Sequence, residues 1–201
     1  MIQIDRFEDQ IRALEQHPVE TGKVLLYGSS FFAHWGVERA KKQWKEAAGL
    51  EVVNHGFGGA VVSELLYYYH RLVRPYQPSA MVFRTGHNDA WEYGPEEMLS
   101  HTKLLFDWVK SDFPGIRLIA IKPFDTPSAL DENLQRIHRY NALLDGLSKD
   151  DPFLETVDIN EFFQSADGSY RDVFLEDGLH LTDSGYEEMA RYLAPKIKAL
   201  L

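Results

Sequence analysis

Short apolar runs alternate with longer segments of helical spacing along the chain, and this alternation restricts the fold more than any other feature. The apolar runs have the length of strands. Several are apolar almost throughout, as is typical of parallel strands covered on both faces. They occur at residues 23–27 (KVLLY), 51–54 (EVVN), 80–85 (AMVFRT), 117–121 (RLIAI) and 156–159 (TVDI).

The segments between these runs carry apolar residues three or four positions apart, which indicates helices. One helix is expected to begin at Pro95, because proline suits the first helical position and Glu96 and Glu97 follow in the first turn. Its buried face is expected to comprise Met98, Leu105, Trp108 and Val109. Other helices are expected near residues 7–14, 37–47, 62–69, 134–144 and 186–200. Alternating strands and helices predict an α/β fold with a parallel sheet of about five strands.

The composition limits the classes of protein to which the chain belongs. Its 201 residues contain 21 Lys and Arg against 31 Asp and Glu, and a net charge of −10 argues against a nucleic-acid partner. No apolar run approaches the ~20 residues of a membrane-spanning helix, and no cysteine is present. Without repeats or linkers, residues 1–201 are expected to form a single domain. The first residues lack the apolar core of a secretory signal, which favours a cytoplasmic location.

The first polar motif is Gly28-Ser29-Ser30, directly after the first apolar run. A serine at a strand-to-helix turn projects its hydroxyl into a cleft, although a lone serine there is more often a turn or N-cap residue. The nucleophile elbow of the α/β-hydrolases is disfavoured, because its second glycine would fall at Phe32.

Two further motifs follow the second and third runs. Residues 54–60 (NHGFGGA) form a flexible loop, but Val61 stands where a dinucleotide-binding loop would require its last glycine. In residues 86–89 (GHND), the Asn88 amide could donate to an oxyanion, or it could form an Asx turn.

The last motif, residues 176–182 (EDGLHLT), places Asp177 three positions before His180. The carboxylate could accept from one ring nitrogen and leave the other free as a general base. All four motifs fall where a parallel sheet places its active site, beyond the carboxyl ends of the strands. Together they supply a nucleophile, oxyanion donors, a base and a residue that orients the base, which acyl transfer requires.

These segments (LLYGSSFFAHW, NHGFGG, GHND and EDGLHLTDSGY) resemble the four blocks of the SGNH (GDSL-type) esterases and acylhydrolases, in particular the subgroup with GSS in the first block. The resemblance implies a flavodoxin-like three-layer α/β/α sandwich. It implies Ser30 as the nucleophile and His180 as the base, held by Asp177. The oxyanion donors would be the N–H groups of Ser30 and Gly59 and the side chain of Asn88.

Two positions differ from the family pattern and bear on rate and substrate preference. Ser29 stands where Asp is more usual, and Ala60 where relatives often carry Ser or Asp. Side chains expected to contact the substrate are Phe31, His55 and His87.

The sequence therefore predicts a serine esterase that cleaves a small-molecule ester with a short acyl or acetyl group, without a cofactor or a metal. Neither a nucleic acid nor a membrane is expected as a partner, and hydrolysis and acyl transfer stay open. One alternative is a metal-dependent hydrolase or phosphodiesterase that uses His34, His55, His87, Asp89 and His180. The other is a non-catalytic binding module on the same fold.

Overall fold

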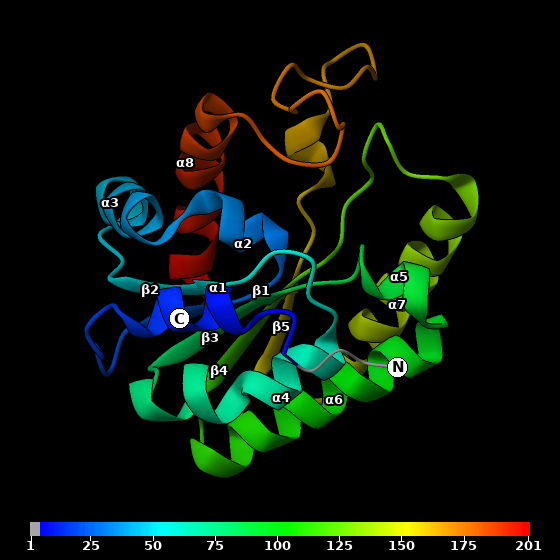
Figure 1. Ribbon diagram of the computed structural model, residues 1–201. Coiled ribbons are helices and arrows are strands. Elements are labelled where there is room, and N and C mark those ends of the chain that lie inside the picture. Colours follow the sequence, from blue (N-terminus) through cyan, green and yellow to red (C-terminus); the bar gives the residue numbers. More distant parts are fainter. Residues whose placement is uncertain (1–4) are drawn as a thin grey trace.

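Five strands form one sheet in the part of the chain that the computed structural model describes, residues 5–201 (Figure 1). The first four residues of the expected domain 1–201 lie outside the described residues. Every neighbouring pair of strands is parallel, and the order is β2-β1-β3-β4-β5. This order is that of the flavodoxin-like sheet, so the predicted fold class is confirmed. The strands are β1 (Val24–Gly28), β2 (Val52–Gly56), β3 (Ala80–Arg84), β4 (Arg117–Ile121) and β5 (Leu154–Val157).

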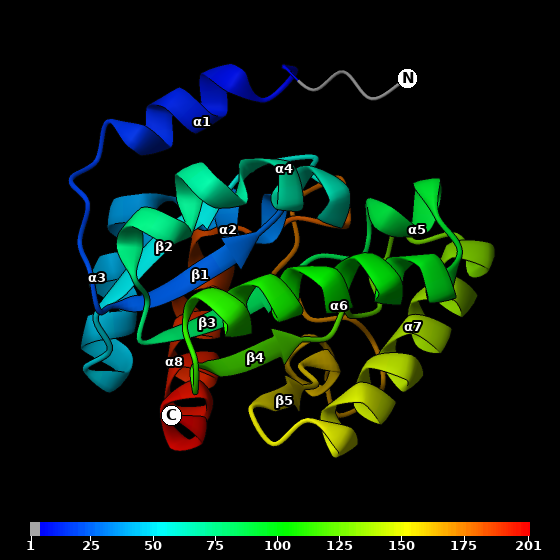
Figure 2. The ribbon, with the colours of Figure 1, turned by 90° about the horizontal axis from the view of Figure 1, so that it is seen from below.

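Helices cover both faces of the sheet and make three layers. Figure 2 shows α4 and α6 in front of the sheet and α8 behind it. One face packs against α1 (Glu8–Glu15), α4 (Val62–Leu72), α6 (Pro95–Asp112) and α7 (Asp131–Asp150). The other face packs against α2 (Ser30–Trp35), α3 (Val37–Ala48), α8 (Asp183–Leu200) and the 3₁₀ segment η2 (Asn160–Phe163). The shorter segments α5 (Asp89–Glu92) and η1 (Arg74–Tyr76) complete the connections.

The alternation of side chains along each strand assigns residues to the two cores. In β1, Leu25 and Tyr27 join the core under α4, whereas Val24 and Leu26 join the core under α8. All four are at least 95% buried. Burial on both faces explains why this strand reads as a continuous apolar run.

Three predicted details are wrong. The second strand continues to Gly56, two residues beyond its predicted end at Asn54. The last strand ends at Val157, because the Asp158 carboxylate accepts from the Asn160 backbone N–H and turns the chain into η2. Trp108 is 36% exposed. Its ring lies on that of His70, whereas Leu105 and Val109 of the same helix fill the core.

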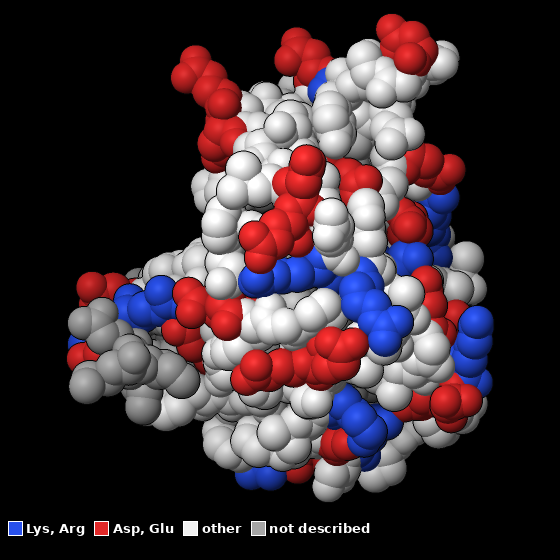
Figure 3. Space-filling model, turned by 90° about the vertical axis from the view of Figure 1, so that its right-hand side faces the viewer, with Lys and Arg blue, Asp and Glu red and all other residues white. Residues whose placement is uncertain are grey.

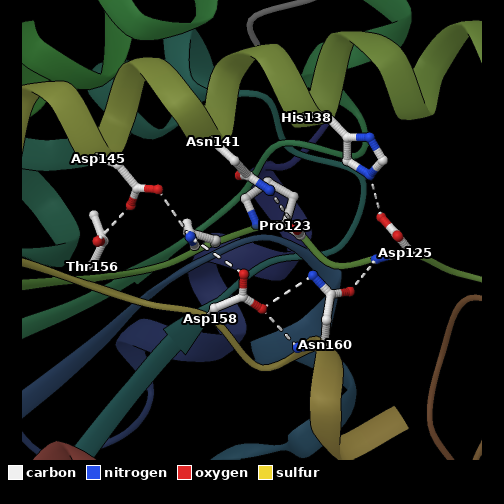
Figure 4. Close-up of polar contacts among 9 residues, drawn as sticks. Pro123, Asp125, His138, Asn141, Asp145, Thr156, Asp158 and Asn160 are labelled. Carbon is white, nitrogen blue, oxygen red and sulfur yellow. Dashed lines mark hydrogen bonds and ion pairs between the residues drawn. The ribbon is translucent and has the colours of Figure 1, made fainter. Parts of the chain in front are cut away.

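A polar network fixes the loop after β4 (Figure 4). Lys122 bridges Asp145 of α7 and Asp158 after β5, at 3.0 and 3.3 Å. The Asn160 side chain accepts from the Asp125 N–H at 2.8 Å. These contacts join the loop after β4 to α7 and to the segment that follows β5.

No helix within residues 5–201 combines the length and the apolar character that crossing a membrane would require.

Candidate functional site

Ser30 is the first residue of α2, directly beyond the carboxyl end of β1. The turn depends on Gly28, because a Cβ there would lie 2.0 Å from the carbonyl oxygen of Arg84. The Ser29 N–H donates to that same carbonyl at 3.2 Å. Ser30 is therefore held at a helix N-terminus, where backbone N–H groups lack intrahelical acceptors. At this position Ser30 can offer both a hydroxyl as a nucleophile and a backbone N–H as a donor to an oxyanion.

Asn54, in the middle of β2, fixes the other end of this helix. Its side-chain amide donates to the carbonyls of Phe32 at 2.8 Å and Gly36 at 3.1 Å. Its carbonyl oxygen accepts from the Gly56 N–H. Asn54 is 2% exposed, so these bonds form in a low-dielectric interior where they are strong. No role was predicted for Asn54, although its place just before the glycine loop was a usable signal.

His180 and Asp177 lie together as predicted from their spacing. The Asp177 carboxylate accepts from His180 Nδ1 at 2.7 Å and, through its other oxygen, from the backbone N–H groups of Leu179 and His180 at 2.9 Å each. Burial opposes ionisation of Asp177, but the hydrogen bonds from His180 and Leu179 lower its pKa to about 2. The carboxylate is therefore charged at neutral pH and fixes His180 with a proton on Nδ1.

The imidazole of His180 is also held from its face. The His34 ring stacks on it, with centroids 4.0 Å apart and planes at 15°. Tyr186 Oη donates to the Phe31 carbonyl at 2.9 Å and thereby joins α8, which begins just after His180, to the helix of Ser30. Tyr186 ends the segment EDGLHLTDSGY that resembles the family, but its role as this link needed the three-dimensional structure.

Ser30 and His180 line one small cavity of about 10 Å³, together with Phe31, Arg84, Phe124, Leu179 and Tyr186. No hydrogen bond joins Ser30 to His180 among the contacts of residues 5–201. His180 Nε2 is buried and lacks a partner within the described chain. In ligand-free sites such catalytic hydrogen bonds are often long and tighten only when the substrate is bound.

The two remaining predicted oxyanion donors lie on adjacent loops. Gly59 has a φ of +82°, which favours glycine. The Asn88 amide donates to the Ala60 carbonyl at 3.0 Å and so joins the two loops. Asp89 fixes them further, because its buried carboxylate accepts from Val62 N–H at 2.8 Å. Burial raises the pKa of Asp89, and hydrogen bonds oppose that shift.

The N-terminal segment clamps the glycine loop from outside. Gln10 accepts from the Gly58 N–H at 2.8 Å and donates to the Gly58 carbonyl at 3.3 Å. Arg6 donates to the Gly59 carbonyl at 3.3 Å and to both oxygens of Glu64 at 2.8 Å. Neither residue stands out in the sequence, since only the fold brings them to a loop about 50 positions away.

The three side chains expected to contact the substrate lie in different places. Phe31 lines the cavity of Ser30. His87 contacts two residues that line this cavity: its Nδ1 accepts from Arg84 at 2.9 Å, and its Nε2 donates to the Phe124 carbonyl at 2.8 Å. Burial first, and then Arg84, lowers the pKa of His87 to about 3, so its ring is neutral.

His55 is directed to the opposite face of the sheet from α2. Its Nδ1 donates to the Leu72 carbonyl at 2.6 Å, and its ring packs against Tyr76. It lines a separate cavity of about 230 Å³ with residues such as His17 and Lys41. Burial lowers the pKa of His55 to about 4. The structure thus does not bring His55 to the cavity of Ser30.

The residues of the metal-dependent alternative do not converge. His55 is on the other side of the sheet, and the oxygens of Asp89 accept from Val62, Gly86 and Thr85. Among residues 5–201, no group of three or more His, Asp or Glu side chains is arranged to hold a metal ion.

Comparison with known proteins identifies a family for this chain. The model of the GDSL-like Lipase/Acylhydrolase family matches residues 26–188. No curated protein sequence matches the chain.

Solved structures are similar over most of their length. A GDSL-like lipase from Bacteroides thetaiotaomicron is 18% identical, with a TM-score of 0.74, and the match covers 99% of this chain and 98% of that one. A catalytic mutant of an acetylxylan esterase from Geobacillus stearothermophilus is 18% identical, with a TM-score of 0.70 and coverages of 90% and 96%. The lipase/acylhydrolase from Enterococcus faecalis is 20% identical, with a TM-score of 0.65 and coverages of 89% and 96%. At these identities the likeness establishes the fold.

Proposed function

The chain belongs to the GDSL-like lipase/acylhydrolase family, and we propose that it is a serine esterase whose nucleophile is Ser30. The observation that carries this proposal is the placement of Ser30 at the start of α2 in one cavity with His180, whose other ring nitrogen is held by Asp177. A nucleophile, a base and a carboxylate that orients the base are the parts of a Ser-His-Asp triad.

In the proposed reaction, Ser30 Oγ attacks the ester carbonyl while its proton passes to His180 Nε2. The resulting imidazolium is stabilised by the charged Asp177. The carbonyl oxygen becomes an oxyanion that accepts from the N–H groups of Ser30 and Gly59 and from the Asn88 amide. Collapse of this intermediate breaks the ester C–O bond, and the proton on His180 passes to the departing alcohol. The acyl group stays on Ser30 until a second nucleophile removes it.

The net charge of the segment that carries Asp177 and His180 favours an uncharged ester. Residues 150–188, which include Asp177 and His180, contain twelve acidic residues and one arginine. On the face in Figure 3, acidic side chains gather at the end where the loops after β5 protrude. A field of this sign disfavours the approach of anionic substrates from that side.

Covalent labelling tests the nucleophile. A fluorophosphonate probe should label the wild-type protein, and Ser30→Ala should abolish labelling because no activated hydroxyl remains. The matched control is Ser29→Ala, which removes the adjacent hydroxyl and should leave labelling intact. Mass spectrometry of the labelled peptide identifies the serine. Labelling that persists in Ser30→Ala would refute the assignment, and an unlabelled wild-type protein would favour the binding-module alternative.

We also propose that the acyl group is short, acetyl being the leading candidate. One structural neighbour is an acetylxylan esterase. Two of the connections that carry the site are short as well: β1 reaches α2 through Ser29 alone, and β3 reaches α5 through residues 85–88. Such connections offer little apolar surface for a long acyl chain.

A series of p-nitrophenyl esters from acetate to octanoate measures this preference. In a long apolar groove each buried methylene would contribute about 0.8 kcal/mol, roughly fourfold in kcat/KM. We expect no such increase, so that kcat/KM for octanoate does not exceed that for acetate. A steady rise with chain length would contradict the short-acyl proposal and leave the nucleophile assignment untouched.

A further inference from the structure

Arg84 is a buried cation beside the proposed nucleophile. It is the last residue of β3, is 2% exposed and lines the cavity that Ser30 and His180 share. Its guanidinium carbon lies 4.8 Å from the ring centroid of Phe31 and 4.6 Å from that of Phe124. No carboxylate within residues 5–201 forms an ion pair with it. Burial lowers the pKa of Arg84 to about 10, so it is still charged at neutral pH.

A buried charge without a counter-ion is costly, and a chain that needed only packing there would place an apolar residue between the two phenylalanines. One of its hydrogen bonds is known: Nη2 donates to Nδ1 of the neutral His87. Its Nε–H is buried and has no partner in the described chain. The position therefore keeps both a positive charge and a free donor next to the site.

Arg84 and His180 both line this cavity, and each has one nitrogen that is unpaired in the described chain; the two nitrogens are complementary. Arg84 Nε carries a hydrogen and can only donate. His180 Nε2 can accept, because Nδ1 holds the proton that is shared with Asp177. Both atoms are buried and unpartnered among residues 5–201. The cavity of about 10 Å³ that their side chains line with Ser30 matches a single water, which needs about 10–15 Å³.

We infer that Arg84 and His180 bind the water molecule that hydrolyses the acyl-enzyme, an inference that rests on the proposed esterase function. The water oxygen accepts from Arg84 Nε–H and donates to His180 Nε2. As the oxygen forms its bond to the acyl carbon, the proton passes to His180 Nε2. Cleavage of the bond to Ser30 Oγ then returns that proton to the serine and releases the acid. Arg84 fixes the position of the attacking oxygen, while the negative charge develops on the acyl carbonyl oxygen, which the proposed oxyanion donors hold.

The test separates the two half-reactions by pre-steady-state kinetics with p-nitrophenyl acetate. Its p-nitrophenolate leaving group departs readily, so we expect acylation to depend little on Arg84. Attack of water on the acetyl-enzyme should depend on Arg84 strongly. We expect Arg84→Met to release one equivalent of p-nitrophenol at close to the wild-type rate. Later turnovers should then be slower by about 10²-fold, the size of loss that misplacing a reacting group can cause. Mass spectrometry should find the acetyl group on the Ser30 peptide.

Two further variants accompany this one. Arg84→Lys keeps the charge but loses the planar donor, so its deacylation should be slowed less than in Arg84→Met. Arg117→Met is the matched control. Arg117 begins β4 at the opposite edge of the sheet and donates to the Pro152 carbonyl, away from the cavity. It should show wild-type rates in both phases.

Parallel loss of both phases in a folded Arg84→Met, or full turnover without an accumulated acetyl-enzyme, would overturn the inference. If Arg84→Met fails to fold, Arg84→Lys decides: an unchanged deacylation rate overturns the role of Nε–H. Failure of the esterase proposal looks different, because the wild-type protein would then lack fluorophosphonate labelling at Ser30.

Discussion

Asp177→Asn is expected to lower kcat by about 10⁴-fold, the loss typical when the carboxylate of such a triad becomes an amide. The carboxylate accepts from His180 Nδ1 at 2.7 Å, and its low pKa keeps it charged at neutral pH. An asparagine NH₂ facing Nδ1 would move the ring proton to Nε2, which could then no longer accept from Ser30. Steady-state kinetics with p-nitrophenyl acetate measures the change.

The control for this prediction is Glu176→Gln, the neighbouring acid in the same loop. It removes the same charge from the acidic segment without touching His180. We expect its kcat to stay within a few-fold of wild type, because a surface charge acts through screened, long-range fields. If the two variants lose activity equally, the effect is one of net charge, and Asp177 has no specific role.

Asn88→Ala is expected to lower kcat by about 10²–10³-fold, as when one oxyanion donor is removed. KM should change little, because the donor acts on charge that develops only in the transition state. The substitution also removes the bond to the Ala60 carbonyl. The melting temperature must therefore be measured with the kinetics.

Asn160→Ala provides the comparison for stability. Its side chain accepts from the Asp125 N–H and donates to Asp158 in the network of Figure 4, away from Ser30. We expect a lower melting temperature with kcat close to wild type. Near-normal kcat in a folded Asn88→Ala would show that this amide is not an oxyanion donor.

Much of the fold follows from the residue pattern, because a strand that is buried on both faces is a recognisable run of apolar residues. The first and fourth strands end within one residue of the predicted positions, and Pro95 begins α6 as expected. The pattern fails where local polar chemistry overrides it. Asp158 caps the turn into η2, so the last strand ends two residues earlier than the sequence predicted.

In the candidate site, the spacing of residues in the sequence predicted contacts only between residues that are close together in the chain. Asp177 and His180 are three residues apart in one loop, and they meet as the sequence predicted. His55 could not be placed in this way. The side-chain alternation in β2 turns it toward Leu72, whereas its neighbour Asn54 faces α2. A shift of one position along a strand exchanges the two faces of the sheet.

The sequence by itself determined the fold class, the family and the motifs that carry the candidate nucleophile, base and oxyanion donors. These features depend on the local spacing of apolar residues and on short segments, so residues close together in the chain are enough to reveal them. The tertiary structure decided what surrounds them: the Gln10 clamp on the glycine loop, the Asn54 anchor of α2, and a buried Arg84 beside Ser30 and His180. Each of these arrangements joins residues far apart in the chain, and only the packing of the sheet and its helices brings them together.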